Sequence, residues 1–141
     1  MIQNLPRIFL MHPVGIGSTR AMNVASTKMW VRALVDILPD VIISAPWLPY
    51  AEVNIDRERG LRDALASIPG HSGAVAVGGD FSMGMVDEWD VFGRLKLPRI
   101  DLTKKPLPGL LTPENFSETI KAFGHTIIEA FQPVMTVRAA A

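Results

Sequence analysis

The chain has 141 residues, of which 48% are hydrophobic and 20% are charged, and its 14 basic side chains balance 14 acidic ones. This length and composition suit one soluble domain with its own core. The even charge balance, without a run of like charge, argues against a nucleic-acid or membrane-surface protein. No apolar stretch approaches the roughly 20 residues of a membrane-spanning helix, and Pro6 and Arg7 interrupt the N-terminal order typical of a signal peptide. We therefore expect a cytoplasmic protein.

The lack of cysteine excludes disulfides, thiol nucleophiles and zinc–thiolate sites. The three histidines, His12, His71 and His125, are far apart in the sequence and do not have the spacing of metal ligands. The sequence therefore predicts neither a metal site nor a cofactor. His12 directly follows the first expected strand, so it either lines a site there or is a histidine of the core or rim.

Two apolar runs near the N-terminus, residues 7–11 and 41–45, are expected to be strands. A helix is predicted between them over residues 23–38. The apolar face expected for this helix consists of Val24, Met29, Val31, Leu34, Val35 and Leu38. Residues 46–50 follow the second strand, and their two prolines favour a loop.

Residues 56–68 are predicted to form a helix with Asp56 as its capping residue. Residues 73–79 are small, apolar and partly β-branched, which is typical of a strand covered on both faces. Either Asp80 or Ser82 is expected to cap the next helix. The apolar face expected for that helix consists of Met85, Trp89, Phe92 and Leu95.

The last expected elements are a strand at residues 99–102 and a helix over about 113–131, followed by a frayed tail at 134–141. Strands and helices thus alternate along the chain. This order predicts the α/β class, as a flavodoxin- or Rossmann-like three-layer sandwich with a four- to five-stranded parallel sheet. The whole chain, residues 1–141, is expected to be one domain.

The first expected strand leads into a turn that contains Gly15, Gly17, Ser18, Thr19 and Arg20. Glycines let a backbone approach a phosphate, and hydroxyl groups, a guanidinium group and a helix N-terminus supply hydrogen-bond donors. The pattern is neither G-x-G-x-x-G nor a Walker A loop. It fits either a phosphate site or an ordinary strand-to-helix turn.

Acidic residues gather after the third expected strand, at an edge where open α/β sheets bind ligands. Glu88 lies in the second turn of the following helix, and Asp80, Asp87 and Asp90 lie nearby in the sequence. A carboxylate here is a candidate base or nucleophile, and carboxylate nucleophiles act on anomeric carbons. The alternative is a solvated helix start, where acids are favoured by the helix dipole. We expect Glu88 to be partly exposed.

Apolar candidates lie at the same edge of the predicted sheet. Trp47 and Tyr50 follow the second expected strand and either stack on a base or anchor their loop. Met83 and Met85 either face a ligand or fill the core.

Residues 82–98 contain the pattern S-x-G-M-x-x-E followed by a glycine and by Leu-Pro. Asp63 precedes the third strand, Asn23 lies early in the first helix, and a small residue followed by Pro46 ends the second strand. In this order and spacing, these residues resemble the nucleoside 2-deoxyribosyltransferase-like superfamily, which includes the 2′-deoxynucleoside 5′-phosphate N-hydrolases. The resemblance covers roughly residues 7–102.

The resemblance implies that Glu88 is a nucleophile that attacks C1′ of a nucleoside or nucleotide and forms a covalent glycosyl–enzyme intermediate, which water or a second base resolves. It implies that Asp63 orients Glu88 or the sugar, or handles a proton on the leaving base. Ser82 and the turn at residues 15–20 would hold a 5′-phosphate. Sites in this superfamily are often completed by a neighbouring subunit, so the resemblance also implies a homo-oligomer, either a dimer or a tetramer.

The candidate catalytic residues are therefore Glu88 and Asp63, and the partner is expected to be a small-molecule nucleotide or nucleoside rather than a nucleic acid or a membrane. The candidate substrate-binding residues are His12, Pro13, Gly15, Gly17, Ser18, Arg20, Asn23, Pro46, Trp47, Asp80, Ser82, Gly84 and Met85. Two other interpretations stay open. One is a non-catalytic nucleotide-binding or sensing module on the same fold. The other is a structural oligomerisation protein in which Asp63 faces away from Glu88.

Overall fold

The computed structural model describes most of the first three quarters of the chain and a few residues near its end. The described residues are 5–15, 17–53, 56–104, 125, 127 and 129–131. Within them, four strands form one parallel sheet in the order β2-β1-β3-β4. These strands are β1 (Arg7–Met11), β2 (Ile42–Ser44), β3 (Gly73–Ala76) and β4 (Arg99–Asp101). This strand order is that of a doubly wound, flavodoxin-like sheet.

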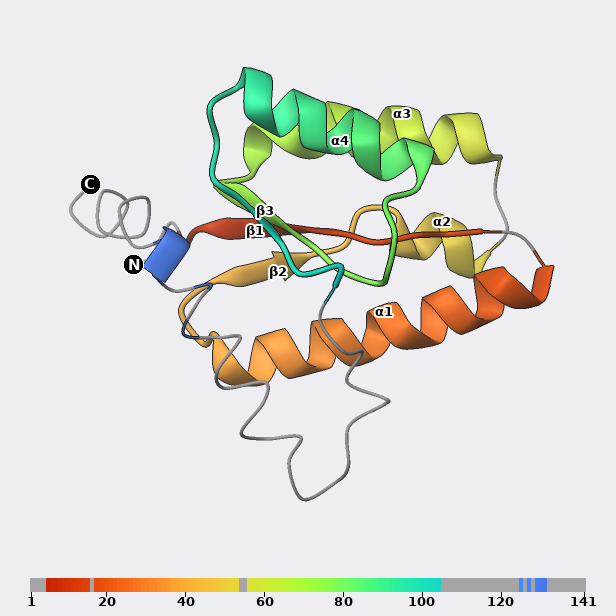
Figure 1. Ribbon diagram of the computed structural model, residues 1–141, viewed down its shortest axis with the longest axis horizontal. Coiled ribbons are helices and arrows are strands. Elements are labelled where there is room, and N and C mark those ends of the chain that lie inside the picture. Colours follow the sequence, from red (N-terminus) through yellow and green to blue (C-terminus); the bar gives the residue numbers. More distant parts are fainter. Residues whose placement is uncertain are drawn as a thin grey trace.

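Helices cover both faces of the sheet, so the predicted α/β three-layer sandwich is confirmed. Figure 1 shows α1 (Gly17–Ile37) on one face and both α3 (Arg57–Ser67) and α4 (Met83–Arg94) on the other. A five-residue helix, α2 (Leu48–Glu52), lies between β2 and α3 in the chain. A 3₁₀ turn, η1 (Ile68–Gly70), leads from α3 to β3.

Alternate side chains of β1 build the two halves of the core, because successive residues of a strand point to opposite faces. Ile8 and Leu10 pack with Trp30 and other residues of α1. Phe9 and Met11 pack on the other face, against residues of α3 and α4 such as Phe92. The sheet is therefore buried on both faces, which explains its near-continuous apolar strands.

Some boundaries differ from those expected. The strand at residues 7–11 is confirmed, and the strands expected at 41–45 and 99–102 are one or two residues shorter. β3 ends at Ala76 rather than at residue 79, because Gly78 and Gly79 have positive φ angles that leave the extended conformation. The loop expected at 46–50 is wrong over residues 48–50, because α2 begins at Leu48 with a proline in its first turn.

The apolar face expected for the first helix is partly wrong. α1 begins at Gly17, inside the predicted turn, and Trp30 and Leu34 face the core while Met29 and Val35 are exposed. Val35 and Met29 are each one position away from a core residue, which rotates them by about 100° around the helix. Leu95 is also exposed, because it caps the C-terminus of α4 instead of continuing its apolar face.

Two capping predictions concern the helices beside the candidate site. The Asp56 side chain accepts a hydrogen bond from the Glu58 amide at 3.1 Å, so the cap predicted for α3 is confirmed. Ser82, rather than Asp80, caps α4 by accepting from the Met85 amide at 3.3 Å. The helix expected at 113–131 is described only at 125, 127 and 129–131, which are helical, and the tail at 134–141 lies outside the described residues.

We predict that Gly73→Ala lowers the free energy of unfolding by about 2 kcal/mol, which is typical of overpacking in a core. A methyl group on Gly73 would overlap the Phe131 ring and lie 2.6 Å from the Pro98 carbonyl oxygen. Urea unfolding of the variant measures this change. Gly70→Ala is the matched control, since a Cβ there meets no atom within 4 Å; equal stability of the two variants would contradict the packing described.

Candidate functional site

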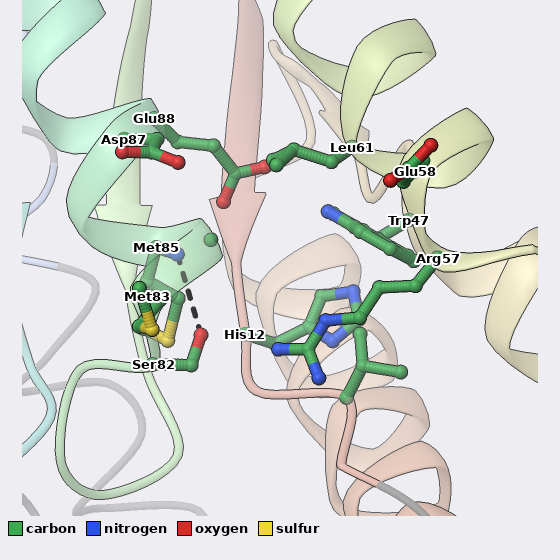
Figure 2. A pocket seen from close by; sticks show the side chains of 12 residues that line it. His12, Trp47, Arg57, Glu58, Leu61, Ser82, Met83, Met85, Asp87 and Glu88 are labelled. Carbon is green, nitrogen blue, oxygen red and sulfur yellow. Dashed lines mark hydrogen bonds between the residues drawn. The ribbon is translucent and has the colours of Figure 1, made fainter.

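A cavity of about 350 Å³ lies at the carboxyl-terminal edge of the sheet, where ligands bind in open α/β folds. His12 and Val14 reach it from the segment after β1, and Trp47 reaches it from the segment after β2. The first turns of α3 contribute Arg57, Glu58 and Leu61. The start of α4 contributes Ser82, Met83, Gly84, Met85, Asp87 and Glu88. The site thus lies between the N-terminal turns of two helices (Figure 2).

Glu88 is the most unusual residue of this cavity. Its side chain is only 1% exposed, and no described group bonds to its Oε2 atom. Burial in this apolar setting, with a smaller contribution from the negative charge of Asp87, raises the pKa of Glu88 to about 8. At pH 7 the carboxyl group is therefore mostly protonated and able to donate a hydrogen bond.

The expectation that Glu88 is partly exposed is wrong. Glu88 lies three residues after Met85 and four before Phe92, which are the other buried residues of α4. This spacing places all three on the face of the helix that is turned toward the sheet. The neighbouring acidic residues Asp87 and Asp90 lie outside this face and are exposed.

His12 brings a second buried titratable group to the cavity. It is 3% exposed, and burial lowers its pKa to about 4, so the ring is neutral at pH 7. Its Nδ1 lies 3.2 Å from the Pro13 carbonyl oxygen, and that bond requires the proton on Nδ1. Nε2, which has no described partner, is then a hydrogen-bond acceptor. The cavity therefore combines an uncharged acid with an uncharged acceptor.

Apolar side chains and three charged ones complete the lining. Trp47 is 6% exposed, and Figure 2 shows its indole nitrogen and the Glu88 carboxyl pointing toward one another across the cavity. Arg57 is the cationic side chain of the lining, and Glu58 and Asp87 are two exposed carboxylates.

Asp63 does not line this cavity among the described residues. Its Oδ2 accepts a 2.6 Å hydrogen bond from the Tyr50 hydroxyl, and its Oδ1 pairs with Arg62 at 3.0 Å. The hydrogen bond from Tyr50 and then that from Arg62 lower the pKa of Asp63. The position of Asp63 therefore gives no support to the catalytic role expected for it.

The turn predicted to hold a phosphate also lies apart from the cavity lining. Arg20 Nε donates to the Gly15 carbonyl oxygen at 3.0 Å, and Asn23 Nδ2 donates to the Val14 carbonyl oxygen at 3.1 Å. Gly17 and Ser18 are in the first turn of α1. The arginine and the asparagine thus bind the turn's own backbone.

The other residues predicted to bind a substrate also fall into two groups, those that line the cavity and those that do not. His12, Trp47, Ser82, Gly84 and Met85 line the cavity, as expected. Pro13, Pro46 and Asp80 do not: Pro13 packs beside Gly78, Pro46 borders a separate groove along β2, and exposed Asp80 pairs with Lys104 at 2.8 Å.

Sequence reasoning missed Val14, Arg57, Glu58 and Leu61 as site residues. One signal for three of them was present, because the Asp56 cap marks the start of α3. In a parallel α/β sheet, that helix start lies at the carboxyl-terminal edge of the strands.

Among the described residues, no group of three or more histidine, cysteine, aspartate or glutamate side chains is placed to hold a metal ion. No helix there has the length and apolar character needed to cross a membrane.

No family model, no curated protein and no solved structure matches this chain. The superfamily resemblance therefore stays a prediction, and the geometry of the cavity is what bears on the function.

We predict that Glu88→Gln is more stable than the wild type by about 3 kcal/mol at pH 7. The pKa of Glu88 rises from its ordinary 4.5 to about 8 on folding, so between these pH values the folded state holds a proton that the unfolded state has lost. The wild type then loses stability as the pH rises, whereas the amide does not ionise. Urea unfolding across this pH range tests the difference, which should nearly vanish at pH 4.5. If Glu88→Gln were no more stable than the wild type at any pH, the Glu88 carboxyl would have to be either exposed to water or hydrogen-bonded.

We predict the opposite pH dependence for His12, whose pKa falls from 6.5 in the unfolded chain to about 4 in the fold. Between these values the unfolded state binds the extra proton, so the wild type loses stability as the pH falls. His12→Gln has no side chain that takes up this proton, so its stability should fall less than that of the wild type as the pH is lowered over the same range. Thermal melts of both proteins measure this, and parallel curves would contradict the burial of a neutral ring.

Proposed function

We propose that the cavity binds a nucleoside or nucleotide and that Glu88 attacks its anomeric carbon, so that the N-glycosidic bond is cleaved or transferred. The observation that supports this most is the buried Glu88 carboxyl, which has an unpartnered oxygen at the ligand-binding edge of a parallel sheet. Buried polar groups are nearly always paired, and unpaired ones concentrate at functional sites.

In the proposed reaction, an oxygen of ionised Glu88 forms a bond to C1′ while the bond from C1′ to the base nitrogen breaks. The electron pair leaves with the base, which takes up a proton and so balances the one lost when Glu88 ionises. Water or a second base then attacks C1′ and frees the carboxylate. Positive charge develops on the sugar in both steps, and a carboxylate among apolar walls stabilises it more strongly than one in water.

The proton on Glu88 sets the pH dependence of this reaction. With a pKa of about 8, roughly a tenth of Glu88 is ionised at pH 7. His12 is a poor acceptor for this proton, because a pKa gap of about 4 between the two groups corresponds to roughly 5 kcal/mol. His12 Nε2 is better suited to accept a hydrogen bond from a ligand hydroxyl or amino group.

The charges of the lining favour an uncharged nucleoside over its 5′-phosphate. Arg57 is opposed there by Glu58 and Asp87. In the turn once expected to hold a phosphate, Arg20 and Asn23 bind backbone oxygens. A doubly charged phosphate at the mouth would meet more negative than positive side chains.

A non-catalytic binding module is the second candidate function. It is favoured by the position of Asp63, which leaves Glu88 without the expected partner, and by the protonated state of Glu88 at neutral pH. This alternative predicts nucleoside binding without release of the base.

The resemblance also supports a homo-oligomer as a proposal, and the cytoplasmic location expected from the sequence likewise stays a proposal. Met83 and Val86 are large apolar side chains of α4 that are exposed beside the cavity, which fits a face covered by another subunit. Light scattering of the pure protein measures the number of subunits.

We predict that the protein releases free base from at least one nucleoside, and that Glu88→Gln lowers the rate by about 10³-fold or more. The assay uses a panel of ribo- and deoxyribonucleosides and their 5′-monophosphates, with and without a second base, and follows free base by chromatography. The rate should rise with pH up to about 8 as Glu88 ionises.

Asp90→Asn is the matched control, since Asp90 is an exposed acid of the same helix that does not line the cavity. It should retain the wild-type rate. Base release that survives in Glu88→Gln would refute the nucleophile, and binding without any release would favour the binding module.

A further inference from the structure

The wall of the cavity that Trp47 forms depends on a very short helix. Trp47 immediately precedes α2, which has only five residues. An isolated helix of this length has no stability of its own. The position of Trp47 is therefore set by the contacts that hold α2 against its neighbours.

The Trp47 ring lies directly over Gly60 of α3, in a space that a side chain would otherwise fill. A Cβ on Gly60 would collide with the six-membered ring of Trp47. The contact explains why Gly60, in the second turn of α3, is buried. It gives one side of the tryptophan a fixed support and leaves the ring as part of the cavity lining.

The Tyr50 hydroxyl supplies the strongest polar bond between α2 and α3. It donates to Asp63 Oδ2 at 2.6 Å, a length typical of charge-assisted hydrogen bonds. Asp63 stays ionised because Tyr50 and Arg62 both donate to it, and Arg59 lies 3.9 Å away. The same bond raises the pKa of Tyr50, which keeps its proton on the donor.

A second polar contact of α2 is weaker. Lys28 of α1 pairs with Glu52 at 3.0 Å, and both side chains are largely exposed. Exposed ion pairs of this kind add little stability, because water and salt screen them. The Tyr50–Asp63 hydrogen bond is thus the main side-chain polar contact that holds α2, the helix directly after Trp47.

We propose that Asp63 is a positioning residue that acts through Tyr50 to fix Trp47 as the aromatic wall of the cavity, against which the planar part of a ligand is held. Binding of a ligand against Trp47 rests on the proposed function, whereas the effect of Asp63 on the position of Trp47 does not require a ligand. An aromatic wall suits a heterocyclic base, because stacking on an indole ring is favourable for any flat, polarisable ring.

The test labels the protein with 5-fluorotryptophan and records the fluorine resonances of Trp30, Trp47 and Trp89, with that of Trp47 assigned by Trp47→Phe. Tyr50→Phe and Asp63→Ala should each shift or broaden the Trp47 resonance and leave the other two in place. Asp63→Asn should change it much less, because the amide oxygen still accepts from Tyr50. Glu52→Gln, which removes the exposed ion pair of the same helix, is the matched control and should change nothing.

Binding of the common ribo- and deoxyribonucleosides, followed by calorimetry, gives a second measurement. Tyr50→Phe and Asp63→Ala should weaken the affinity by roughly tenfold, with Asp63→Asn and Glu52→Gln close to the wild type. If no nucleoside binds the wild type, the proposed function is wrong, and the fluorine spectra alone decide the role of Asp63.

An unchanged Trp47 resonance in Tyr50→Phe would overturn the proposal. Equal shifts of all three tryptophans would do so as well, because they would mean that the bond supports the whole fold rather than this wall.

Discussion

The buried carboxyl of Glu88 is the constraint on which the properties of the cavity depend. A carboxyl group without a described partner loses its hydrogen bonds to water on folding and gains none from the protein in exchange. The fold tolerates this cost because Met85 and Phe92, on the same face of α4 as Glu88, belong to a large apolar core. Such a group lowers the stability of the fold unless a ligand bonds to it. A stability cost of this kind is typical of a functional site.

The parallel sheet is what brings this carboxyl to a ligand. The order β2-β1-β3-β4 places the ends of β1 and β3 side by side. The segment after β1 supplies His12, and the helix after β3 supplies Glu88, so two buried uncharged groups from distant parts of the sequence share one cavity. Their opposite pKa shifts have one cause, since burial disfavours the charged form of both an acid and an imidazole.

The sequence predicts the framework of the site well and its contacts poorly. Strand-like runs, the Asp56 and Ser82 caps and the position of Glu88 on α4 follow from local patterns, because propensity and capping act within a few residues. The bond between Tyr50 and Asp63 joins two helices, and nothing local distinguishes it from a free aspartate that faces the cavity. The burial of Glu88 was likewise missed, since its position on the buried face of α4 outweighs the general preference of glutamate for solvent.

The charge state of Glu88 can be measured without knowledge of the ligand. The protein is labelled with ¹³C at the side-chain carboxyl of glutamate, the Glu88 signal is assigned with Glu88→Gln, and its chemical shift is followed against pH. Our account predicts a midpoint near pH 8, well above the ordinary value of 4.5 for a glutamate. A midpoint near the ordinary value would mean that the carboxyl is solvated or paired, and would contradict the buried, uncharged acid on which the proposed chemistry depends.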